Sequence, residues 1–187
     1  MNSLILIAVL LLFMVFAYQL GRQRVLQKAG GDRRVLHSLP GYYGAYVALF
    51  CGLPALAIVA LWLAFEPHIV ETILVGGLPA AAQALPAGEL NLLINDIRNI
   101  ATGNISSRTP DAAVLAAADR YSDLRSISFA AMAVIGLAVA IGGFAFARKR
   151  LQPNLRARPV VEGVVHWALL IASIIAVLIT VGIVLSL

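Results

Sequence analysis

Charged side chains are scarce in this sequence. Only 12% of its 187 residues are charged, 61% are hydrophobic, and the mean hydropathy is +0.92. A soluble domain carries roughly 25% charged residues, because its surface must be hydrated. The composition therefore excludes a soluble globular domain and predicts an integral membrane protein.

Cysteine is nearly absent as well. Cys51 is the only one, and it lies inside an apolar run. A single cysteine excludes an intrachain disulfide and a cysteine metal cluster. We expect Cys51 to serve as a small packing residue.

The sequence also lacks the motifs that carry chemistry. It contains no glycine-rich phosphate loop, no Walker sequence and no pair of catalytic cysteines. Its apolar runs hold no ionisable side chain away from their ends, whereas an ion or proton path needs polar groups at depth. We therefore expect no enzyme activity, no catalytic, cofactor-binding or metal site, and no cofactor.

Two groups of histidines and carboxylates come closest to a site. His37 and His166 fall at the same predicted membrane face, and Glu162 lies one turn before His166, but no further partner completes a catalytic arrangement.

The second group is the metal-like cluster Glu66, His68 and Glu71. We expect Pro67 to break its helical spacing, and no second histidine is near. The sequence thus predicts an ordinary helix exit at this point.

The basic residues are concentrated in two short segments. The net charge is +5 and the pI is near 9.9, but the lysines and arginines do not spread over one face as a nucleic-acid surface requires. Segments 21–40 and 148–159 hold most of them beside apolar runs, which predicts two cytoplasmic loops by the positive-inside rule. For segment 21–40, contact with anionic lipid or a cytoplasmic partner is an alternative role. We expect no nucleic-acid partner.

Four apolar runs are long enough to cross a membrane as helices. They cover residues 3–20, 42–65, 127–147 and 160–187. The predicted fold is therefore all-α, with a helical hairpin at 1–65, an external segment at 66–126 and a second helical pair at 127–187. With the basic loops inside, both termini lie outside. The first run has no basic residue before it, basic residues directly after it and no small-residue cleavage site, so we expect an uncleaved helix.

The external segment holds seven acids and four arginines, a balance that suits the outer side. Its helical spacing predicts two short helices. The first ends at Gly103 and Asn104. Its apolar face consists of Leu90, Leu93, Ile94, Ile97 and Ile100. The other begins with Thr109 as its N-cap, Pro110 in its first turn and Asp111 at the positive end of the helix dipole, and it continues through 112–126 into the membrane. Between the second membrane helix and these two, residues 78–88 are expected to form a linker or loop.

Small residues recur on the membrane helices and predict faces where a neighbouring backbone approaches closely. On the second helix they are Gly44, Ala48 and Gly52. On the third they are Gly136, Ala138, Ala140 and Gly142. On the fourth, Ala168, Ala172, Ala176 and Thr180 form one stripe.

The run LHSLPGYYG, residues 36–44, together with the apolar helix after it, resembles the N-terminal region of bacterial phosphate ABC transporter permeases of the PstC type. The resemblance extends through LNLLINDIRNIATGNIS and DAAVLAAADRYSDLRSIS, residues 90–106 and 111–128. It resumes at residues 161–187, which are similar to the first helix of the permease core. It thus covers nearly the whole chain.

The resemblance implies a subunit of the bacterial inner membrane that associates with a second permease subunit, an ATPase and a periplasmic phosphate-binding protein. The family's core supplies the translocation helices and the loop that docks on the ATPase, and neither basic segment here matches that loop. No functional residue of the family transfers to this chain. We therefore expect a non-catalytic N-terminal region of a phosphate importer permease, as a fragment, a truncated gene product or a separately encoded half.

Two other functions remain open at this point. The external segment points to a sensory or regulatory protein that contacts a binding protein or a kinase. The four helices alone are also compatible with a free-standing membrane scaffold of unrelated function.

Overall fold

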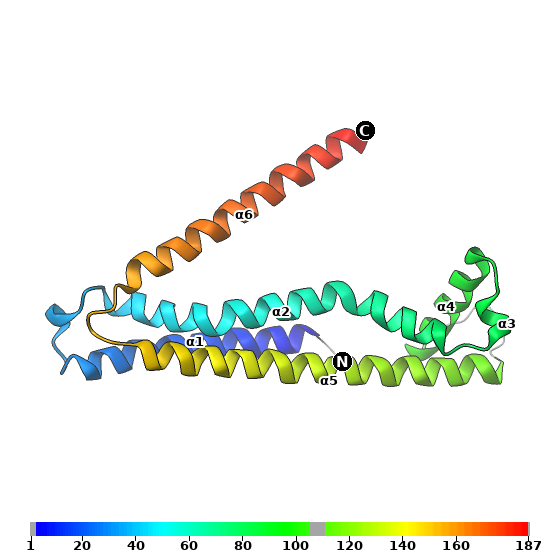
Figure 1. Cartoon of the computed structure of the whole chain (residues 1–187), viewed down its shortest axis with the longest axis horizontal. Coiled ribbons are helices and arrows are strands. Elements are labelled where there is room, and N and C mark those ends of the chain that lie inside the picture. The colour runs from blue at the N-terminus through cyan, green and yellow to red at the C-terminus, as the bar shows by residue number, and fades with distance from the viewer. Residues whose placement is uncertain (1–2, 105–110, 187) are drawn as a thin grey trace. The chain divides into compact units, whose positions relative to one another are not determined.

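The computed structural model describes residues 3–104 and 111–186, and within these ranges the regular secondary structure is helical (Figure 1). The elements in chain order are α1 (Ser3–Lys28), η1 (Arg33–Val35), α2 (Pro40–Gly76), α3 (Ala80–Gln83), α4 (Ala87–Ala101), α5 (Ala112–Arg150) and α6 (Ala157–Ser186). Four of these, α1, α2, α5 and α6, are long and apolar enough to cross a membrane. The all-α prediction with four such helices is confirmed.

The long helices extend beyond the apolar runs. α1 continues through the basic residues to Lys28, and α2 continues past residue 65 to Gly76. Charged side chains end an apolar run, but arginine, lysine and glutamate are themselves good helix formers, so the helix does not stop with it. α5 likewise begins at Ala112 and continues without a break to Arg150, as the sequence predicts for this segment.

The chain divides into two compact units. Unit 1 comprises Met1–Ile7 and Leu56–Leu137, and unit 2 comprises Ala8–Ala55 and Ala138–Leu187. Unit 2 holds ten lysines and arginines against two acids, whereas unit 1 holds four arginines against seven acids. The two basic loops therefore belong to one unit and the acidic segment 66–126 to the other.

The core of unit 2 lies where α2 meets α1, the end of α5 and the first residues of α6. Tyr43, Val47 and Cys51 of α2 are fully buried there, and Cys51 is a packing residue as predicted. The predicted small-residue face on α2 is confirmed. A Cβ atom on Gly44 would lie 2.7 Å from the Tyr18 carbonyl oxygen of α1.

The predicted face on α5 is only half right. Gly136 and Ala140 are buried, but Ala138 and Gly142 are exposed. The contact falls on Gly143, where a Cβ atom would press on the Phe50 carbonyl oxygen and lie 3.0 Å from the Cys51 Cα. At 3.6 residues per turn, Gly143 lies three residues after Ala140 and shares its helix face. Ala138 and Gly142 lie two residues from Ala140 and therefore point to other faces.

The two basic loops of unit 2 are hydrogen-bonded to each other. The Pro153 carbonyl accepts from the Tyr43 hydroxyl at 2.7 Å and from the His37 backbone N–H at 3.2 Å. Lys28 Nζ donates to the Leu151 carbonyl at 2.7 Å. These bonds fix the α1–α2 connection against the α5–α6 connection.

Beyond its first turns, α6 is exposed. Ala157 and Val161 are its buried residues, and Val165 to Val184 carry exposed apolar side chains (orange to red in Figure 1). No part of its most apolar stretch is buried within the described residues. The four residues of the predicted stripe, Ala168, Ala172, Ala176 and Thr180, are accordingly all exposed.

In unit 1, α4 packs against the C-terminal part of α2 and the N-terminal part of α5. Its predicted apolar face is confirmed, since Ile94 and Ile97 are buried and the helix is followed by Gly103 at φ +76°. The predicted linker contains the short helix α3, whose Gln83 Nε2 donates to the Leu78 carbonyl at 2.7 Å. Of the predicted helix start, the N-cap Thr109 and the first-turn Pro110 lie outside the described residues. Asp111, the predicted acid at the helix start, accepts through Oδ1 from the Ala112 N–H at 2.7 Å.

Candidate functional site

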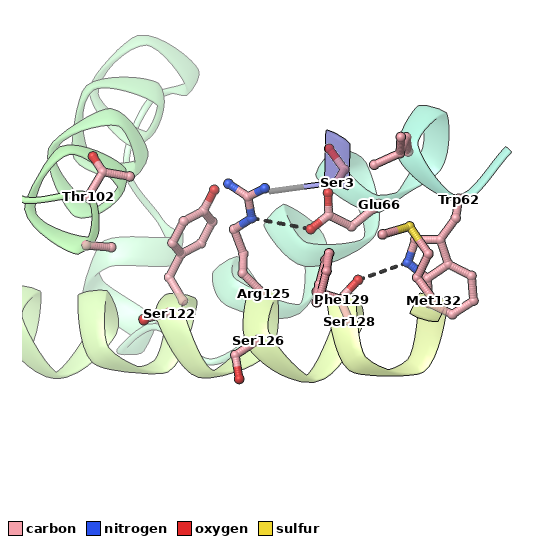
Figure 2. Close-up of a pocket in the computed structure, with 13 residues that line it drawn as sticks. Ser3, Trp62, Glu66, Thr102, Ser122, Arg125, Ser126, Ser128, Phe129 and Met132 are labelled. Carbon is pink, nitrogen blue, oxygen red and sulfur yellow. Dashed lines mark hydrogen bonds and ion pairs between the residues drawn. The ribbon is translucent and has the colours of Figure 1, made fainter. Parts of the chain in front are cut away.

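A polar cavity of about 600 Å³ lies between α2 and α5 in unit 1 (Figure 2). The first residue of α1 and the end of α4 also contribute to its wall. Most of its polar lining residues carry a hydroxyl group: Ser3, Thr102, Tyr121, Ser122, Ser126 and Ser128, of which Figure 2 shows Ser126 directed away from the others. The cavity can therefore both donate hydrogen bonds to a polar ligand and accept them.

One ion pair crosses the cavity. Arg125 Nε on α5 lies 3.4 Å from Glu66 Oε1 on α2, and Figure 2 shows the two side chains directed at each other. The Glu66 side chain is only 12% exposed, whereas that of Arg125 is 52% exposed. Removing Arg125 would leave a largely buried carboxylate without its counter-charge, which is more costly than the pair itself is stabilising.

A tryptophan forms the second polar contact of the cavity. Trp62 Nε1–H donates to Ser128 Oγ at 3.0 Å, again joining α2 to α5 (Figure 2). Tryptophan is enriched at membrane–water interfaces because its ring is apolar and its N–H group is polar. The contact places the cavity at the ends of the predicted membrane spans, which fall at residues 65 and 127.

An apolar groove of about 510 Å³ adjoins this cavity. It shares Trp62, Glu66 and Ser128 with the cavity. The rest of its wall is formed mainly by aliphatic and aromatic side chains of α2 and α5, among them Ile58, Leu61, Phe65, Ile127 and Ala131. A polar site and an apolar site thus meet at three common residues.

The metal-like cluster predicted at Glu66, His68 and Glu71 divides between two arginines. Glu66 pairs with Arg125, while Glu71 Oε2 lies 3.6 Å from Arg98 Nη2 of α4. The expectation that Pro67 breaks the helix is wrong, because α2 runs through it to Gly76, and the chain has no helix exit here. Over residues 3–104 and 111–186, no group of three potential metal ligands comes together.

His37 of the first basic loop and His166 of α6 do not form a site with Glu162. That carboxylate accepts from Arg158 Nε at 2.6 Å and from the Tyr42 hydroxyl at 3.2 Å. His166 is exposed on α6, and His37 contributes its backbone N–H to Pro153. The structure therefore makes Glu162 part of a surface ion pair.

Sequence reasoning missed the pairing of Glu66 with Arg125. The two residues lie on different helices, and no local spacing connects them. The available signal was positional, because each is the first charged residue beyond a predicted membrane span.

A family model described as phosphate ATP-binding cassette transporter matches residues 7–179, nearly the whole chain. The chain belongs to this family. The match begins in α1 and ends in α6, so this phosphate ATP-binding cassette transporter protein is matched across both units. The resemblance found in the sequence is confirmed at this level, and with its four apolar helices the chain is a membrane protein. Comparison with curated proteins and with solved structures gives no match.

Proposed function

We propose that this chain is a non-catalytic N-terminal membrane region of a phosphate importer permease, contributing to the assembly or regulation of phosphate uptake across the bacterial inner membrane. The observation that carries the proposal is the family match over residues 7–179. Its partners are a second permease subunit, an ATPase and a periplasmic phosphate-binding protein.

The exposed α6 supports a role in assembly. A helix whose apolar stretch is not buried by any part of residues 3–104 and 111–186 faces either lipid or another subunit. Its stripe of small residues would let another helix approach closely, and van der Waals packing of that kind drives helix association in membranes. We assign the stripe Ala168, Ala172, Ala176 and Thr180 to contact with the second permease subunit.

Co-purification tests this assignment. The tagged chain, expressed with the remaining permease core, the second permease subunit, the ATPase and the binding protein, should retain the membrane partners in detergent. Ala172→Trp should lower recovery of the second subunit by about fivefold or more, because it fills the small-residue stripe. Ile174→Trp, on another face of α6, is the matched control and should leave recovery unchanged.

Two results would contradict the proposal. Retention of no partner by the unsubstituted chain would favour a free-standing scaffold or a sensory protein acting through residues 66–126. Equal recovery with Ala172→Trp and Ile174→Trp would remove the stripe from the interface while leaving the association itself in place.

The proposed orientation gives a separate prediction. In a Cys51→Ala background, Glu89→Cys on α4 should react with a membrane-impermeant maleimide in right-side-out vesicles, and Asn154→Cys between α5 and α6 should not. Both positions are exposed, so the difference reports the side of the membrane. Asn154→Cys should be protected because the positive-inside rule predicts that the basic loops lie in the cytoplasm. The opposite labelling pattern would mean that the chain has the inverse orientation.

A further inference from the structure

We propose that the polar cavity and the adjoining apolar groove of unit 1 together bind one zwitterionic phospholipid. Its phosphate would lie at Arg125, its ammonium group at Glu66, and one acyl chain in the groove. The proposal is independent of phosphate import, since it concerns a ligand held between α2 and α5 on the outer side.

The juxtaposition of the two spaces indicates an amphiphile. The cavity is rich in hydroxyl groups, whereas the groove presents almost only carbon, and the two share Trp62, Glu66 and Ser128. A small polar solute would leave the groove without an occupant, and a purely apolar one would leave the cavity unused. A phospholipid joins a polar headgroup covalently to an apolar chain, so one molecule could occupy the two adjoining spaces.

The charges of the cavity select the headgroup. Glu66 and Arg125 give the site one charge of each sign, and their atoms lie 3.4 Å apart at the closest. The half-exposed guanidinium of Arg125 has five N–H donors in a planar fork, of which the Glu66 contact engages Nε. The others remain suited to a phosphate, which arginine binds through paired hydrogen bonds.

The Glu66 carboxylate disfavours an anionic headgroup. A phosphate at Arg125 would stand close to this carboxylate, and an uncompensated like-charge contact weakens binding. An ammonium group on the same headgroup provides the compensating charge and donates hydrogen bonds that the carboxylate can accept. A phosphatidylethanolamine-type headgroup has this arrangement.

The depth of the site also fits a headgroup. Glu66 and Arg125 border the predicted spans, and Trp62 and Tyr121, both in the cavity wall, are residue types that concentrate at membrane interfaces. The groove extends along α2 on both sides of the ion pair, with Ile69 and Ile73 beyond it. The acyl chain would take the part on the span side, which Ile58, Leu61 and Ala131 line.

Fluorescence quenching of Trp62 tests the proposal. The chain has two tryptophans, so Trp167→Phe leaves Trp62 as the sole reporter, and the full-length protein is reconstituted with phospholipids brominated on one acyl chain. Brominated phosphatidylethanolamine should be favoured over brominated phosphatidylglycerol by about fivefold in relative affinity, which corresponds to about 1 kcal/mol. Equal quenching by the two lipids, or a preference for the anionic one, would overturn the proposal.

Substitutions assign the preference to the named residues. Glu66→Gln and the double variant, which leaves no unpaired charge, should each reduce the preference to about onefold, because the carboxylate that disfavours the anionic lipid is gone. Arg125→Gln keeps that carboxylate, so it should keep the preference but weaken quenching by both lipids through loss of the phosphate contact. Glu71→Gln is the matched control, because it removes a paired carboxylate from the same helix outside both spaces, and it should keep the preference. Ala131→Phe, which fills the groove, should weaken quenching by both lipids. A preference that persists in Glu66→Gln and in the double variant, or quenching unaffected by Arg125→Gln or by Ala131→Phe, would exclude this site.

Discussion

Gly143→Ala should destabilise the protein by about 1–3 kcal/mol, although alanine is the better helix former. The added methyl group would press on the Phe50 carbonyl oxygen and approach the Cys51 Cα, both of which are backbone atoms of α2. Backbone cannot rotate out of the way as a side chain does, so α5 and α2 must separate and lose packing along their contact. Unfolding in mixed detergent, followed by circular dichroism, measures the change.

Gly142→Ala is the matched control for this prediction. It lies one residue earlier on α5, and a Cβ atom there has no neighbour within 4 Å. Replacing a helical glycine by alanine should stabilise this variant by about 0.5–1 kcal/mol or leave it unchanged. If the two variants shifted stability in the same direction and by similar amounts, the close approach of α5 to α2 at Gly143 would be refuted.

Tyr43→Phe should destabilise the protein by about 1–2 kcal/mol. The Tyr43 side chain is fully buried, and its hydroxyl donates to the Pro153 carbonyl at 2.7 Å. Phenylalanine preserves the ring packing but removes the O–H donor. The Pro153 carbonyl in the loop after α5 then has one hydrogen bond fewer. The His37 N–H still reaches that carbonyl at 3.2 Å, which keeps the loss from being larger.

Tyr42→Phe offers a direct comparison on the neighbouring residue. Its hydroxyl donates to Glu162 Oε1 at 3.2 Å in an exposed setting, where water replaces the lost bond. We expect a change below about 0.5 kcal/mol, measured in the same detergent titration. Equal losses of unfolding free energy for the two tyrosine variants would show that burial does not make the Tyr43–Pro153 hydrogen bond more stabilising than an exposed one.

The helices themselves could be predicted from the sequence because apolar runs and helical spacing are local properties. The apolar face of α4 and the small-residue face on α2 around Gly44 both follow from residue spacing alone. Their lengths were harder to predict. Apolarity marks where lipid ends, whereas helix ends depend on backbone hydrogen bonding, so α1 continues to Lys28 and α2 runs through Pro67.

The contacts between helices were less accessible. Gly142 and Gly143 are identical residues side by side, and only the rotation of α5 relative to α2 decides which of them meets Phe50. The pairing of Glu66 with Arg125 depends in the same way on how two distant helices are placed. A single sequence does not show which residues of distant helices come into contact. The candidate site can therefore be recognised only in the structure.

The bond between Tyr43 and Pro153 also sets a waiting time during synthesis. Its two residues are 110 positions apart in the chain, and ribosomes add about 5–20 residues per second. The Tyr43 hydroxyl therefore spends roughly 5–20 s without its native acceptor after Tyr43 has been added to the chain. During this interval the α1–α2 hairpin exists with an open flank, and a nascent chain arrested before Pro153 would be the form most exposed to degradation or mispairing.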